Sequence, residues 1–189
     1  MTVPLVKQAH DKVAKYLQAG DIVVDATMGN GFDTLFLARA IGERGKVYAF
    51  DVQATAVEAT KTRLNEAGVS ERVRLIHDSH AGLSAYLQSD NMDSIRCVMF
   101  NLGYLPGSDK VSKTNSESTI KALTAAIGLL NCPGIISVLA YTEHLGGREE
   151  ADRVKSWAMS LPTTQFNVNI QIPEASNKSP PEWIVIECR

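Results

Sequence analysis

The spacing of apolar and polar side chains predicts helices and strands that alternate along most of the chain. Apolar residues recur every three or four positions, as in amphipathic helices, at 5–18, 33–41, 54–67, 80–88, 117–130 and 147–160. Ser116 precedes the fifth of these helices and is expected to cap it. Short apolar runs predict strands at 21–26, 47–51, 73–76, 95–101, 135–141, 166–172 and 183–188. This alternation predicts an α/β fold with a seven-stranded, mostly parallel sheet, helices on both faces, and an antiparallel hairpin made by the last two strands.

Length and charge are those of an ordinary globular protein. The 189 residues suffice for one domain, spanning 1–189, with a full core. A net charge of −2 does not indicate a strongly basic nucleic-acid binder. No signal peptide opens the chain, and no apolar run approaches the ~18 residues of a membrane helix. We therefore expect a cytoplasmic protein with no membrane partner.

The three cysteines are Cys97, Cys132 and Cys188, and none belongs to a C-x-x-C pair. Cys97 and Cys188 lie in apolar, strand-like runs. These features predict buried thiols in a reducing compartment rather than disulfides or zinc ligands. No metal site is expected.

The stretch 22–34 combines a strand, a glycine turn and the start of a helix. An apolar run ends in Asp25, and Gly29 and Gly31 follow within a few residues. The third glycine of the dinucleotide fingerprint is replaced by Thr34, and a carboxylate at the strand end would repel a pyrophosphate. The same carboxylate would attract a cation, and an acid followed by glycines resembles the first motif of S-adenosylmethionine-dependent methyltransferases. A purely structural strand–turn–helix is the alternative.

Other acids stand where later strands end, which is the edge at which open α/β sheets bind ligands. Asp51 is placed to accept the hydroxyls of a ribose, with helix capping as the alternative. Asp78 is placed to accept an adenine amino group, although Asp78 or Ser79 could instead cap the next helix. The candidate cofactor contacts along this edge are Asp25, Thr27, Met28, Gly29, Asn30, Gly31, Asp33, Thr34, Asp51, Gln53, Asp78, Ser79, His80 and Asn101.

The stretch 101–107, Asn-Leu-Gly-Tyr-Leu-Pro-Gly, directly follows an apolar strand. Several amino-group methyltransferases have an Asn/Asp-Pro-Pro-aromatic loop at this place, where the Asn oxygen accepts hydrogen bonds from the target amine and the aromatic ring packs on the target. Asn101 and Tyr104 resemble that arrangement. A turn with a buried tyrosine is the alternative.

Five strings together carry a more specific resemblance, at 25–31, 33–38, 48–53, 79–80 and 100–107. They are similar to one bacterial family that has been labelled as rRNA methylases. Its members include the tRNA methyltransferase that converts 5-aminomethyl-(2-thio)uridine at the wobble position to 5-methylaminomethyl-(2-thio)uridine. The resemblance implies the Rossmann-like class I methyltransferase fold, S-adenosyl-L-methionine as cofactor and the tRNA anticodon loop as partner.

The resemblance also suggests roles for residues of the site. Asn101 and Tyr104 would hold the amine, and His10 and His144 are candidate proton acceptors or base contacts, with a structural hydrogen-bonding role as the alternative for each histidine. Tyr104 and Tyr141 would stack on splayed bases of the anticodon loop.

Positive side chains near the same edge are the candidate RNA contacts, and they are Lys110, Lys113 and Arg148. Solvated surface charges are the alternative for all three. A homodimer would widen the RNA-binding surface. Other interpretations are an rRNA or small-amine methyltransferase of the same fold, an NAD(P)-dependent oxidoreductase, and a non-catalytic S-adenosylmethionine-binding module.

Overall fold

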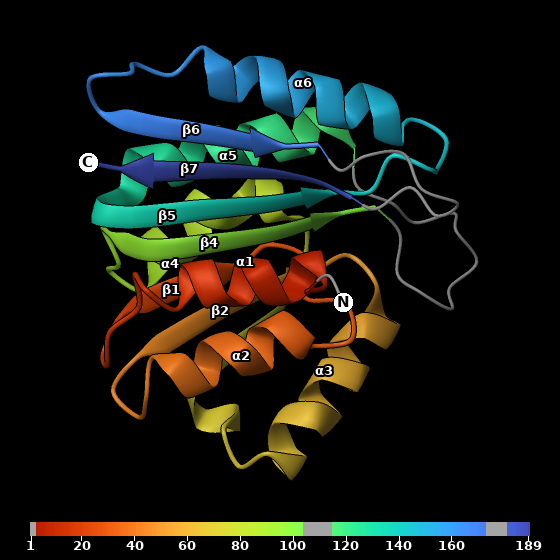
Figure 1. Ribbon diagram of the computed structural model, residues 1–189. Helices are drawn as coiled ribbons and strands as arrows, with labels where there is room; N and C mark the ends of the chain where they lie inside the picture. The colour runs from red at the N-terminus through yellow and green to blue at the C-terminus, as the bar shows by residue number, and fades with distance from the viewer. Residues whose placement is uncertain (1–2, 104–114, 173–180) are drawn as a thin grey trace.

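A computed structural model describes residues 3–103, 115–172 and 181–189 and contains a seven-stranded sheet of order β3-β2-β1-β4-β5-β7-β6 (Figure 1). Its strands are β1 (Ile22–Asp25), β2 (Lys46–Asp51), β3 (Val73–His77), β4 (Ile95–Leu102), β5 (Leu130–Ala140), β6 (Phe166–Gln171) and β7 (Glu182–Cys188). β7 runs antiparallel to both β5 and β6, and the other pairs are parallel. The predicted mixed sheet with a C-terminal hairpin is confirmed.

Helices cover both faces of this sheet. They are α1 (Leu5–Val13), α2 (Phe32–Ala40), α3 (Ala54–Glu66), α4 (Leu83–Ser89), α5 (Ser116–Leu129) and α6 (Gly147–Met159), with 3-10 turns at Ser70–Arg72 and His80–Gly82. Alternate strand residues point to opposite faces, so Val23 packs with α1 to α3 while its neighbour Val24 packs with α4 to α6. Each face therefore has its own apolar core. Figure 1 shows α1 to α3 in front of the sheet.

Two helix ends differ from the sequence pattern. The first helix stops at Val13 rather than at residue 18. The apolar spacing in the sequence extends to Leu17 because Tyr16 and Leu17 pack against the core, although both lie outside the helix. The cap of α5 is Asn115, whose side-chain oxygen accepts from the backbone N–H of Ser118 at 3.0 Å, so Ser116 is the first helical residue instead.

The structure corrects the expectation for two cysteines. Cys132 and Cys188 form a disulfide with their Cα atoms 5.2 Å apart. β5 and β7 are neighbours in the sheet, and their register pairs Gly134 with Cys188, which brings the nearby Cys132 alongside. That register cannot be read from the sequence. Cys97 is buried and free, as predicted.

The carboxyl ends of β1 to β5 meet at one edge of the sheet, together with the amino ends of α2, α5 and α6, on the right in Figure 1. Because these five strands run in the same direction, the loops predicted from the sequence as candidate ligand contacts lie at one edge. Within the described ranges, no helix combines the length and the apolar character needed to cross a membrane.

Candidate active site

The turn between β1 and α2 is held tightly against α3. Gly29 and Gly31 have positive φ angles of 50° and 79°, a region that glycine enters without strain. The N–H of Gly31 donates to the carbonyl of Met28 at 2.7 Å, and the Thr60 hydroxyl donates to the carbonyl of Gly29 at 3.0 Å. A Cβ on Gly31 would lie only 2.8 Å from Oγ1 of Thr60. The sequence therefore needs glycine at this position.

Asp25, the last residue of β1, holds the turn through two hydrogen bonds. Its side chain is fully buried, accepting from the Thr34 hydroxyl at 2.6 Å and from the Thr27 backbone N–H at 3.2 Å. Burial, and next the charge of Asp33, raise the pKa of Asp25 to about 7. Asp25 thus acts on the site through its charge and through the loop that it holds.

Asp51 closes the other side of the turn. One carboxylate oxygen accepts from the Gly29 N–H at 3.0 Å, and the other accepts from the Gln53 N–H at 3.0 Å. Arg63 of α3 donates from Nε to the carbonyl of Asn30 at 2.7 Å. The structure therefore brings together the acids after β1 and β2 that the sequence placed at one ligand site.

The residues after β3 divide between the rim and the interior. The Asp78 carboxylate accepts from the Tyr86 hydroxyl at 2.9 Å and from the Ser79 N–H at 2.7 Å. Ser79 caps the 3-10 turn, accepting from the Ala81 N–H at 3.2 Å. Of the two roles predicted from the sequence, cofactor contact and helix capping, this contact is the capping role. His80 is buried, and one ring nitrogen lies 2.9 Å from the carbonyl of Ala26. Burial lowers the pKa of His80, which keeps its ring neutral.

Asn101, at the end of β4, is linked to two other elements. Its backbone N–H donates to the Thr27 hydroxyl at 2.6 Å, and its side-chain Nδ2 lies 2.5 Å from Oδ2 of Asp33. The other oxygen of Asp33 lies 2.6 Å from Nε2 of His10, whose ring stacks on Phe36 with centroids 4.1 Å apart. Two predicted site residues, His10 and Asn101, are thus joined through Asp33. The sequence had suggested Asp33 as a cofactor contact, and the chain order gave no sign of this link.

The segment after β5 reaches the same place. A Cβ on Gly103 would lie 3.4 Å from Cβ of Tyr141 and 3.7 Å from Nε2 of His144, so these side chains press against the end of β4. Burial, and next the charge of Asp33, raise the pKa of Tyr141. The structure therefore brings Tyr141 and His144 beside Gly103, two residues after Asn101. Tyr104, Lys110 and Lys113 lie outside the described residues.

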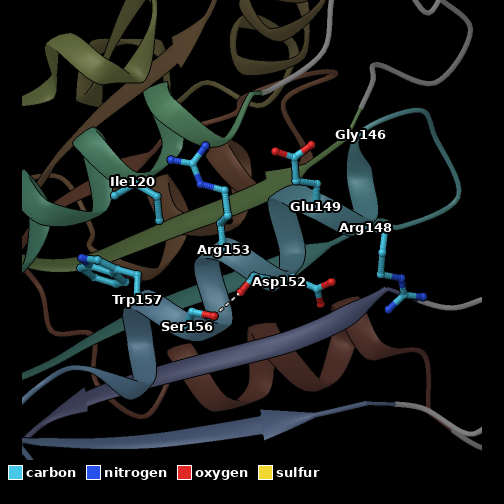
Figure 2. A pocket seen from close by; sticks show the side chains of 8 residues that line it. All are labelled: Ile120, Gly146, Arg148, Glu149, Asp152, Arg153, Ser156 and Trp157. Atoms are coloured by element: carbon cyan, nitrogen blue, oxygen red, sulfur yellow. Dashed lines mark hydrogen bonds between the residues drawn. The ribbon is translucent and has the colours of Figure 1, made fainter.

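A separate hollow of about 780 Å³ lies along α6 and is not part of this site (Figure 2). Its lining residues are Ile120, Gly146, Arg148, Glu149, Asp152, Arg153, Ser156 and Trp157. Arg148 donates to Glu182 at 2.5 Å, and Arg153 donates to the Ser116 hydroxyl at 2.6 Å. The lining carries two arginines and two carboxylates, so it has no net positive charge. Arg148, a candidate RNA contact, is held here in an ion pair.

The glycine turn fits a cationic ligand. Asp25, Asp33 and Asp51 all lie at the turn, and burial together with the charges of Asp33 and Asp51 raises the pKa of Asp25. A phosphate would add a further negative charge to this group and be repelled. S-adenosylmethionine carries a sulfonium and an ammonium and no phosphate, so the carboxylates complement it. The residues present therefore fit this cofactor.

Known proteins match the chain over most of its length. The family described as "Putative rRNA methylase" matches residues 47–187. The chloroplastic tRNA (mnm(5)s(2)U34)-methyltransferase of Arabidopsis thaliana is 39% identical over 166 residues, covering 84% of this chain and 60% of that protein. The ribosomal RNA small subunit methyltransferase H of Psychrobacter cryohalolentis is 31% identical over 99 residues, covering 52% of this chain and 28% of that protein. The chain thus spans less than two thirds of the length of either relative.

Solved structures agree with these matches. The crystal structure of a Clostridium thermocellum protein described in the same words as the family superposes with a TM-score of 0.94 at 36% identity, over the whole of both chains. A Streptococcus mutans protein of the methyltransferase class, solved in complex with SAH, superposes with a TM-score of 0.88 at 32% identity, also over both whole chains. The family match covers more than half of the sequence, and the fold and turn suit the same cofactor, so the protein belongs to the rRNA methylase family and is an S-adenosylmethionine-dependent methyltransferase of the Rossmann-like class I fold.

Proposed function

We propose that the protein methylates the amine of 5-aminomethyl-(2-thio)uridine at the wobble position of tRNA, forming 5-methylaminomethyl-(2-thio)uridine. The observation that carries this proposal is the Asn101 side chain, which stands at the end of β4 with its amide held by Asp33 at 2.5 Å. An amide oxygen suits an amine N–H, and the Arabidopsis relative is named as a methyltransferase of this tRNA nucleoside.

The amine must be neutral in order to attack. If its pKa were ~10.4, as for lysine, about one molecule in ~2,500 would be neutral at pH 7, which costs up to ~4.6 kcal/mol. Correct positioning of two reactants contributes roughly 7–11 kcal/mol. Orientation alone therefore offsets the cost, and no strong base is needed.

Residues of the chain supply this orientation. Oδ1 of Asn101 accepts an N–H of the amine, while Asp25, Asp33 and Asp51 hold the positive cofactor through the turn after β1. When bound, S-adenosylmethionine supplies the electrophilic methyl group, whose transfer to the amine nitrogen breaks the C–S bond and leaves the electron pair on sulfur. His144 and Tyr104 are proposed to contact the uracil ring. The substrate ammonium releases one proton to solvent before the attack.

Exposed apolar side chains around this edge are proposed to receive the bases of the anticodon loop. Leu145 is 88% exposed, and Phe32 and Ile172 are also large and exposed. Phe32 begins α2, Leu145 follows β5 and Ile172 follows β6. Figure 1 shows that the start of α2 and the carboxyl ends of β5 and β6 lie at the sheet edge where β4 also ends. Single-stranded bases can leave their stack and pack on such side chains.

Replacing Tyr141 with alanine is expected to raise the KM for tRNA about tenfold or more. The ring is 39% exposed beside the site, and stacking of one base on an aromatic ring contributes ~1–3 kcal/mol. Steady-state kinetics with varied tRNA measures the effect. Tyr141→Phe keeps the ring and should retain the wild-type KM. Met159→Ala, which removes a side chain 66% exposed at the opposite edge, should also leave KM unchanged. An unchanged KM for Tyr141→Ala would contradict the stacking role.

Cofactor binding is expected to strengthen as the pH rises toward 7. Because the pKa of Asp25 is raised to about 7, the free protein holds this carboxyl protonated at lower pH, and a cationic ligand must displace the proton. Linkage then predicts that log Kd falls by up to about one unit per pH unit below pH ~7 and levels off above it. Titration calorimetry across this pH range, in buffers of different ionisation enthalpy, gives both Kd and the protons released.

Asp25→Asn supplies the baseline for that measurement. The α-amino group of the ligand itself titrates near ~7.7–8.0, and the variant retains this contribution while it lacks the carboxyl proton. We expect the slope below pH ~7 to flatten in the variant. Equal slopes for both proteins would show that Asp25 is not the group that titrates.

The proposed function is tested on tRNA that carries 5-aminomethyluridine at the wobble position. The tRNA is incubated with the protein and S-adenosylmethionine and digested to nucleosides, and the wobble nucleoside is weighed by mass spectrometry. A gain of one methyl group supports the proposed substrate and reaction together. No gain, with cofactor binding retained by calorimetry, would overturn the proposed substrate and direct the search to ribosomal RNA or a small amine.

A further inference from the structure

We propose that Asp33 is the positioning residue of the transfer step. Its carboxylate, held by His10, binds Nδ2 of Asn101 and so turns Oδ1 of Asn101 toward the incoming amine. This inference rests on the proposed function, because Asn101 is the residue that holds the amine there.

The contacts of Asp33 leave one arrangement for the Asn101 amide. Oδ2 of Asp33 lies 2.5 Å from Nδ2 of Asn101, and Oδ1 lies 2.6 Å from Nε2 of His10. An ionised carboxylate only accepts hydrogen bonds, so the end of the amide that faces it must be the NH₂ group. The amide oxygen then occupies the other end, whichever way the two atoms were first assigned.

The orientation matters because the two ends of an amide act on an amine in opposite ways. An oxygen accepts the N–H of the amine and leaves the nitrogen lone pair free to attack. An NH₂ group in the same position would donate a hydrogen bond to that lone pair and occupy the electrons that form the new N–C bond. Asp33 therefore selects the orientation that permits methyl transfer.

The surrounding residues fix the carboxylate itself. The Asp33 side chain is 7% exposed and that of His10 is 23% exposed, so the pair lies between the interior and the solvent. The His10 ring lies flat against Phe36, with 3° between the two planes, which limits its rotation. The backbone N–H of Asn101 donates to the Thr27 hydroxyl at 2.6 Å. Both ends of the Asp33–Asn101 link are thus held before any substrate arrives, which is the preorganisation that transition-state stabilisation requires.

The contacts of Asp33 also distinguish its role in orienting Asn101 from a role in stabilising α2 alone. Asp33 lies in the first turn of α2, where any acid interacts favourably with the helix dipole. That interaction needs no partner, yet the carboxylate is directed to residues of α1 and β4 that are distant in sequence. A role confined to the helix would depend only on the charge at position 33 and would be indifferent to which side chain stands at position 101.

The inference is tested by exchanging the carboxylate at position 33 and the amide at position 101, first one at a time. Asp33→Asn leaves two amides facing each other, so neither end of Asn101 is specified, and Asn101→Asp places two carboxylates together. We expect each single variant to lose about 100-fold in kcat. The KM for tRNA should stay within about threefold of wild type. Because both changes alter the charge beside the cofactor turn, the Kd for S-adenosylmethionine is measured for each variant and kcat is compared at saturating cofactor.

The double variant Asp33→Asn/Asn101→Asp restores a matched pair. The new amide at position 33 donates to the new carboxylate at position 101, whose other oxygen accepts from the amine. We expect kcat at least about tenfold above either single variant, a non-additivity that is expected of two residues joined by a hydrogen bond. A double variant no more active than the single ones would overturn the positioning role.

A second measurement does not depend on activity. In ¹⁵N-labelled protein, the side-chain NH₂ of Asn101, assigned by its loss in Asn101→Ala, should exchange slowly with water, and Asp33→Asn should abolish that protection. Fast exchange in the wild-type protein would overturn the inference. A wild-type protein that leaves the wobble nucleoside unmethylated would overturn the proposed function, and the exchange measurement would still decide whether Asp33 holds Asn101.

Discussion

Replacing Asn101 with alanine is expected to lower kcat for methyl transfer by about 10²–10³-fold. Such losses are typical when one preorganised hydrogen-bonding group is removed from a reacting centre. The Kd for S-adenosylmethionine should remain within about threefold of wild type, because the turn that holds the cofactor is fixed by Asp25, Asp51 and Thr60 rather than by the Asn101 side chain. Its contact with Thr27 is made by the backbone N–H, which alanine retains.

Single-turnover kinetics on tRNA with saturating cofactor measures this loss, and calorimetry measures the Kd. Asn115→Ala is a matched control, because it removes an asparagine that caps α5 through the Ser118 N–H at 3.0 Å. Loss of a cap costs ~1 kcal/mol of stability, and kcat should be unaffected. If Asn101→Ala retained more than about a tenth of wild-type kcat, the amine would be held by other groups.

The acids of the cofactor site could be predicted because they follow from local signals and one topological rule. Asp25 and Asp51 each end an apolar run, and parallel strands place their carboxyl ends on one edge. The structure confirms their meeting, since Asp51 accepts from the Gly29 N–H of the turn that Asp25 supports. The same rule brought Asn101 to this edge.

Side-chain links between distant segments could not be predicted in this way. His10 and Asn101 were separate candidates, and only the packing of α1 beside α2 shows that Asp33 joins them. Cys132 and Cys188 are adjacent only through the register of β5 and β7. Periodicity describes which face of an element is buried, and it carries no information about which side chains of two packed elements meet.

Replacing Gly31 with alanine is expected to destabilise the protein by about 2–5 kcal/mol and to raise the Kd for S-adenosylmethionine more than about tenfold. Its φ of 79° costs a side chain ~1–2 kcal/mol. The new Cβ would also lie 2.8 Å from Oγ1, 2.9 Å from Cγ2 and 3.0 Å from Cα of Thr60, and such overpacking adds ~1–3 kcal/mol. Because the backbone Cα is among these atoms, rotation of the Thr60 side chain cannot relieve the contact. α3 or the turn must move, which breaks the bond from Thr60 to the Gly29 carbonyl.

Two further variants separate strain from crowding in this prediction. Gly68→Ala has a similar φ of 67° with no atom within 4 Å of its Cβ, so it should cost only the ~1–2 kcal/mol of strain and leave cofactor binding unchanged. Thr60→Ala in the Gly31→Ala background removes the two side-chain atoms and should recover part of the lost stability, whereas in the wild-type protein it should cost ~1 kcal/mol for the lost hydrogen bond. Chemical denaturation gives the free energies of unfolding, and calorimetry gives Kd. Equal losses for Gly31→Ala and Gly68→Ala would mean that the turn is not packed against α3 tightly enough to shape the cofactor site.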